Sequence, residues 1–164
     1  MELQRITTEY DKAEDRIRLT GETDKGTTVV LWHTRRLLDR LIPHLTLWLE
    51  HQHADLPRAD LIQEFAQQTA QSQFVPQAPV TAPGREGLLV QAIDLTPGAE
   101  QLHLSFKTGE GQPVGLSLAA LPLRQWLTIL HQAYGTAEWP TTVWPAWMTE
   151  ARQSSTPTPT TMWH

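Results

Sequence analysis

The stretch "GTTVVLWHTRRLLDRL", residues 26–41, passes directly from a strand pattern into a helix pattern. Gly26 can adopt the positive φ of a tight turn, and the β-branched residues after it favour a strand. Thr34 then provides a suitable N-cap for a helix. A similar stretch, "GQPVGLSLAALPLRQW", occupies residues 111–126. The order of turn, strand and helix therefore occurs twice, and it determines the predicted fold.

Further strand patterns precede both stretches, at residues 3–10, 16–23, 88–95 and 101–108. When residues 16–45 are shifted by 85 positions onto residues 101–130, seven positions are identical without a gap. We therefore predict two strand–strand–strand–helix repeats, about 3–53 and 88–135, which arose by internal duplication. The alternative is that any three-stranded meander followed by a helix shares this pattern.

The segments around the repeats complete the predicted organisation. Residues 57–71 have the pattern of one extra linking helix, with Leu61, Ile62 and Phe65 on its apolar face, and residues 74–87 form a Pro-rich linker. We expect a kink or a break at Pro43 in the helix of the first repeat. The fold class is thus α+β, with antiparallel sheets and helices packed on them, in a single domain over residues 1–148. Residues 149–164 are a low-complexity tail.

Composition excludes several classes of function. The formal net charge of the 164 residues is −5, which makes a nucleic-acid partner held by bulk charge unlikely. There is no cysteine, which excludes disulfides and sites ligated by thiolates. The polar start of the chain and the lack of a long apolar run predict a cytoplasmic protein without a membrane segment. We expect no cofactor.

Strand alternation suggests a partner-binding surface on the first repeat. If Val29 and Leu31 face the core, then Val30 and Trp32 point outward and need a cover. The linker, the C-terminal segment or a second subunit are the candidates for that cover. Trp163, near the end of the tail, is a third candidate for partner binding.

Two polar groups are candidates for ligand binding. Arg36, Arg40 and His44 recur every four residues on the first helix, so they form a basic stripe for an anion or an acidic partner. The stretch "HQHAD" places His51, His53 and Asp55 at alternate positions and resembles the H-x-H-x-D-H motif of the metallo-β-lactamase superfamily, but Leu56 replaces its last histidine. These three residues are weak metal candidates, and we predict no metal site and no catalytic residues.

The leading hypothesis is a non-enzymatic protein-interaction or assembly module that acts through apolar and tryptophan-bearing surfaces, as a homodimer or with another protein. One alternative is a small-molecule-binding protein or an enzyme with its site between the two repeats. A second alternative is a nucleic-acid binder that uses the arginines of the first repeat.

Overall fold

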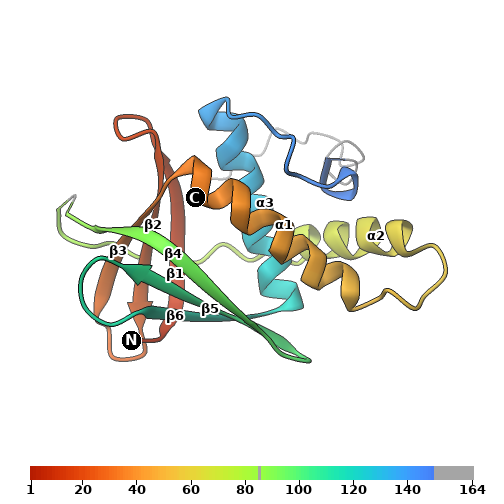
Figure 1. Cartoon of the computed structure of the whole chain (residues 1–164), viewed down its shortest axis with the longest axis horizontal. Helices are drawn as coiled ribbons and strands as arrows, with labels where there is room; N and C mark the ends of the chain where they lie inside the picture. The colour runs from red at the N-terminus through yellow and green to blue at the C-terminus, as the bar shows by residue number, and fades with distance from the viewer. Residues whose placement is uncertain (85, 150–164) are drawn as a thin grey trace.

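The computed structural model describes residues 1–84 and 86–149. Figure 1 shows the strands at one end of the molecule and α2 at the other, with α1 and α3 between them. A short helical turn begins at residue 146. Among the described residues, no helix has both the length and the apolarity needed to cross a lipid bilayer. The elements follow in the order β1 (Leu3–Asp11), β2 (Arg16–Thr23), β3 (Thr28–His33), α1 (Arg35–His51), α2 (Ala59–Ser72), β4 (Leu88–Pro97), β5 (Gln101–Thr108), β6 (Val114–Ala119) and α3 (Ala120–Ala137).

The strands form one six-stranded mixed sheet in the order β1-β2-β3-β4-β5-β6. Within each half the three strands are antiparallel, but β3 and β4 pair in parallel, at Leu31–Leu88 and Trp32–Leu89. A parallel pair needs a long crossover connection, which α1, α2 and residues 73–87 supply here. The predicted α+β class is confirmed. The three strands of each repeat are antiparallel as expected, whereas the parallel β3–β4 pair, which joins the two meanders into one mixed sheet, was not expected.

The sheet curls until its two edge strands meet. Glu2, just before β1, forms an isolated parallel bridge with Gly115 of β6, and the Gly115 N–H donates a hydrogen bond to the Met1 carbonyl, at 2.9 Å. β1 and β6 form no ladder beyond this point. The seam between the two halves is therefore closed at one end and open along the rest of β1.

The core lies between the inner face of the sheet and the helices α1 and α3. Leu19 and Leu31 from the first half pack in the same cluster as Leu104 and Leu116 from the second. Thr34 caps α1 by accepting a hydrogen bond from the Leu37 N–H, at 3.2 Å. Residues of both halves therefore contribute to one shared core.

The helix ends differ slightly from those expected. α1 continues through Pro43 as one helix, and Pro43 lies on its exposed side. α3 continues past Gly135, where we expected it to stop, and ends at Ala137, followed by the C-cap residue Glu138 with a positive φ.

The strand registers of the two halves match at a spacing of 85 residues in the second hairpin of each half but not in the first. Leu19 pairs with Leu31 across β2 and β3, and Leu104 pairs with Leu116 across β5 and β6, so these two hairpins share a register. The β1–β2 and β4–β5 registers differ, since Tyr10 pairs with Ile17 but Leu95 pairs with Leu104. That the two halves arose by internal duplication stays a prediction.

The segment 74–87 has neither helix nor strand in its described residues, as its prolines predict. It crosses the outer face of the first half (Figure 1). The Val80 N–H donates to the Thr7 hydroxyl at 2.8 Å, and the Arg18 guanidinium donates to the Gly84 carbonyl at 3.0 Å. At its end, Gly87 packs directly on Trp32, because a Cβ added there would lie 2.7 Å from the indole nitrogen. The linker thus forms a second layer over β1, β2 and β3.

Candidate binding groove

A groove of about 660 Å³ lies along the open part of the seam between the two halves. One wall is formed by residues 2–8 of the first strand region and the other by residues 116–118 of β6. The first turns of α3 form the floor, and residues 74–80 lie along the side. The groove exists because β1 and β6 separate after the Glu2–Gly115 bridge, so that a helix and not a neighbouring strand fills the gap.

The floor of the groove is apolar and fixed in position. Trp126 is buried, and its indole N–H donates to the buried Thr8 hydroxyl across the seam, at 3.0 Å. Ile6 and Ile129 lie beside this pair, partly exposed to the groove. Because Trp126 is buried, the apolar surface that the floor offers to a ligand comes from Ile6 and Ile129, which pack around it.

The rim of the groove is polar, and its two charged side chains, Arg5 and Glu2, are of opposite sign. Arg5 forms an ion pair with Glu22 at 3.0 Å, and Glu2 approaches the His103 ring nitrogen at 3.2 Å. The remaining polar character comes largely from neutral amides, which can both donate and accept hydrogen bonds. Four glutamines contribute them: Gln4, Gln77, Gln101 and Gln125. A neutral rim favours a ligand with amide groups over a strongly charged one.

The backbone of the groove walls adds directional hydrogen-bonding groups. β1 pairs with β2 on one side only, and β6 pairs with β5 on one side only. Alternate residues of each strand therefore direct their N–H and C=O groups toward the seam. Beyond the bridge at Glu2, β1 and β6 leave these edges without a strand partner in the described part of the chain. The groove thus combines an apolar floor with two strand edges.

The structure places the predicted partner-binding residues elsewhere. Val30 and Trp32 are 4% and 7% exposed under the linker, so neither reaches the surface in this structure. Trp163 lies outside the described residues. Tryptophans in the described residues are at most 8% exposed: Trp32, Trp48, Trp126, Trp139, Trp144 and Trp147. They belong to the interior, and the groove exposes apolar surface without an exposed indole.

The basic stripe is partly assembled into a shallow depression of about 620 Å³ at the start of α1. Arg36 and Arg40 line it and are exposed, whereas His44 does not line it. Arg16 and Arg35 also line the depression. The four-residue spacing of the stripe did not predict them, because Arg16 is on β2 and Arg35 lies on a different side of α1. The depression is open, and acidic residues already occupy part of it.

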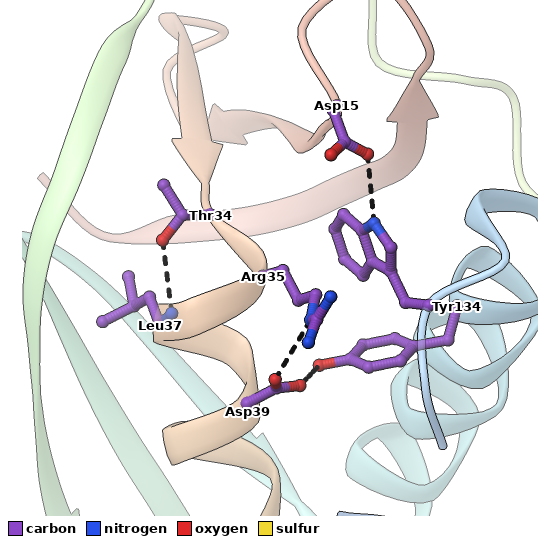
Figure 2. A network of polar contacts seen from close by, with 7 residues as sticks. Asp15, Thr34, Arg35, Leu37, Asp39 and Tyr134 are labelled. Atoms are coloured by element: carbon purple, nitrogen blue, oxygen red, sulfur yellow. Dashed lines mark hydrogen bonds and ion pairs between the residues drawn. The ribbon is translucent and has the colours of Figure 1, made fainter. Parts of the chain in front are cut away.

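Those acidic residues form structural contacts (Figure 2). Asp39 accepts a hydrogen bond from the Tyr134 hydroxyl at 2.6 Å and forms an ion pair with Arg35 at 3.4 Å. Burial and the hydrogen bond to Asp39 raise the pKa of Tyr134 well above its ordinary value. This network ties α1 to α3 and neutralises part of the positive charge, so the depression is less suited to an anion than its arginines suggest.

Asp15 connects the β1–β2 turn to the segment after α3. Its carboxylate accepts hydrogen bonds from the Tyr10 hydroxyl at 2.7 Å and from the Trp139 indole at 3.0 Å. These two donors lower the pKa of Asp15. No local pattern identified this residue, because both partners are supplied by the tertiary fold.

The histidines are not assembled into a metal site in the described residues. His51 is the last residue of α1, His53 and Asp55 follow it, and no group of three or more potential ligands is assembled to hold a metal there or elsewhere in residues 1–84 and 86–149. His33 is buried against Phe106, and neither ring nitrogen makes a hydrogen bond of good geometry in this described region, although the Leu31 backbone lies close to the ring. Burial lowers the pKa of His33 to about 4, and the Leu31 backbone opposes this only in part.

Comparison of the chain with protein-family models, with curated proteins and with solved structures found no match. The function therefore has to be argued from the groove itself.

Proposed function

We propose that this protein is a non-enzymatic interaction module whose seam groove binds an extended segment of a partner protein. The observation that supports this most is the open seam, where two strand edges border an apolar floor. An extended peptide that adds to a strand edge gains main-chain hydrogen bonds, and its alternate side chains enter pockets. The groove supplies both kinds of contact.

The rim chemistry favours a peptide over a charged ligand. Arg5 already forms an ion pair with Glu22, and Glu2 already contacts the His103 ring. The glutamine amides of the rim match the hydrogen-bond donors and acceptors of a peptide backbone. The apolar floor around Trp126 provides space for one or two aliphatic or aromatic side chains. We therefore expect a partner segment that alternates apolar and polar residues and carries little net charge.

A small apolar molecule is the second candidate ligand, because the groove volume of 660 Å³ falls within the range of small-molecule sites. It also matches the hypothesis of a site between the two halves. The two ligands differ in their need for the strand edges, since a small molecule uses the floor alone.

Selection from a display library of short random peptides on the immobilised full chain distinguishes these proposals. We expect enriched peptides to alternate apolar and polar residues and to bind in fluorescence anisotropy measurements. Ser117→Trp, which fills the groove from β6, should weaken their binding at least about tenfold. Asp55→Trp places the same side chain on the exposed loop between α1 and α2, which does not line the groove, and should leave binding unchanged.

Two outcomes would contradict the peptide proposal. Enriched peptides that bind the Ser117→Trp protein as tightly as the parent would show that they use another surface. A library without enrichment, together with binding of an apolar fluorescent dye that Ser117→Trp abolishes, would favour the small-molecule alternative. Sedimentation of the parent and of both variants tests whether the protein is a homodimer. If it is, the groove forms the dimer contact only if Ser117→Trp dissociates the dimer.

A further inference from the structure

Helix α2 turns its polar side inward and its apolar side outward. Gln63 and Gln67 are 1% and 0% exposed. The Gln63 amide donates to the Leu49 carbonyl at 3.1 Å, and the Gln67 amide donates to the Arg124 carbonyl at 2.9 Å. In contrast, Leu61 and Phe65, which the sequence grouped as the apolar side of this helix, are 41% and 59% exposed. The pattern is the reverse of an ordinary surface helix.

The reason for this orientation is the buried guanidinium of Arg124 on α3. It donates to the side-chain oxygens of Gln63 at 2.5 Å and Gln67 at 3.5 Å, and its other side faces the Trp147 ring, 5.4 Å from the ring centre. Burial lowers the pKa of Arg124 to about 10. A buried charge needs hydrogen-bond acceptors, and the amides of α2 provide them. Because Gln63 and Gln67 must face Arg124, Leu61 and Phe65 must face away.

The outer face of α2, defined as Leu61, Phe65 and Thr69, is too small for a stable contact between two copies. These residues form one stripe because they recur every four positions. An aromatic side chain contributes about 150–250 Å² when fully exposed, and these side chains are only about half exposed. A stable interface buries about 800 Å² on each partner. The face therefore suits an occupant of one or two side chains.

The C-terminal segment of this chain fits that requirement in position and length. Trp147 contacts Arg124 and donates its indole N–H to Glu50 at 3.0 Å, so the last described residues lie beside the inner side of α2. Between residues 149 and 163 an extended chain spans up to about 45 Å, whereas an α-helix with its side chains is about 10 Å wide. The large apolar residues within 150–164 are Met162 and Trp163.

We propose that Met162 and Trp163 dock on the outer face of α2 and cover Leu61 and Phe65. The contact is intramolecular, so the high effective concentration of a tethered segment compensates for its small area. The segment between them, with its prolines and threonines, contributes length without competing apolar groups. This contact does not depend on the function proposed for the groove.

Pairs of introduced cysteines test the contact directly, since the natural chain contains none. Thr69→Cys with Thr161→Cys places one thiol on the outer face of α2 and one beside Met162. Gln132→Cys with Thr161→Cys is the matched control, because Gln132 is an exposed helical position on α3. Under mild oxidation, we expect the first pair to form its intramolecular disulfide at least about tenfold faster than the control pair.

Phe65→Ser or Trp163→Ser, added to the first pair, should reduce its rate to that of the control. Phe65 is exposed, so this substitution leaves the fold intact. Equal rates for the two unmodified pairs would overturn the proposal. Disulfides that form mainly between molecules, at a rate that rises with protein concentration, would assign this face to a second copy instead.

Discussion

The outer faces of the two halves of the sheet differ, although the strands follow the same order. In the first half Val30 and Trp32 are buried beneath the linker. At the positions 85 residues later, Gly115 packs against Glu2, and Ser117 is exposed. The first half therefore has a second layer over its sheet, and the second half meets solvent there.

This difference shows that outward-facing residues decide whether a sheet acquires a second layer. Both halves bury the same inner positions, such as Leu31 and Leu116. An outward Trp makes covering favourable, because leaving it in water forgoes roughly 2–3 kcal/mol. An outward Ser provides no such gain. The halves can thus be made more alike or more different by single substitutions.

The largest effect is expected for Trp32→Ser, which gives the first half the residue of the second. We expect the free energy of unfolding in urea to fall by about 4 kcal/mol, because the change removes a buried aromatic ring and leaves a cavity under Gly87. Ser117→Ala is the control and should change it by less than about 0.5 kcal/mol. Equal effects at the two positions would show that the linker adds no stabilising layer.

The next comparison is between His33 and Leu118, which occupy equivalent ends of β3 and β6, opposite Ile17 and Leu102. The folded pKa of His33 is about 4, below its ordinary value of 6.5, so the unfolded chain takes up a proton first as the pH falls. Stability is retained above pH 6.5 and is lost progressively down to about pH 4. The loss amounts to about 3 kcal/mol.

His33→Leu gives the first half the residue of the second and should abolish this pH dependence. At pH 7 we also expect a gain of about 1 kcal/mol, because two buried nitrogens without partners are removed. Urea unfolding at several pH values measures the difference in the free energy of unfolding between parent and variant. The titration of other groups affects both proteins equally and cancels in this difference. Parallel pH curves would mean that His33 is protonated in the folded protein or accessible to water.

The smallest of these effects concerns the glycines at the two contacts between halves. Gly87→Ala places a Cβ about 2.7 Å from buried atoms of Val30 and Trp32, and we expect a cost of about 2 kcal/mol. Gly115→Ala meets the carboxylate of Glu2, whose side chain is largely exposed and can rotate away. Thermal unfolding should therefore separate the two variants clearly. A larger loss for Gly115→Ala would reverse the proposed order of packing.

Much of the fold followed from local patterns. The alternation of apolar residues, the turn glycines and the cap at Thr34 predict the strands and the two main helices within a few residues. The parallel β3–β4 pair did not follow, because pairing between distant strands depends on how the crossover folds. The groove was equally hidden, since residues 2–8, 74–80 and 116–129 meet only in the folded chain.

The sequence by itself determined the α+β class, the order of strands and helices, and the irregular linker with its prolines. These features depend on periodicity and backbone preference, which act over a few neighbouring residues. Only the tertiary structure decided which face of α2 is buried. Its apolar residues predicted the opposite face, but the buried charge of Arg124 requires the amides of Gln63 and Gln67 as acceptors. Leaving a buried charge without partners costs more than exposing Leu61 and Phe65 to water, so the distant arginine set the orientation of the helix.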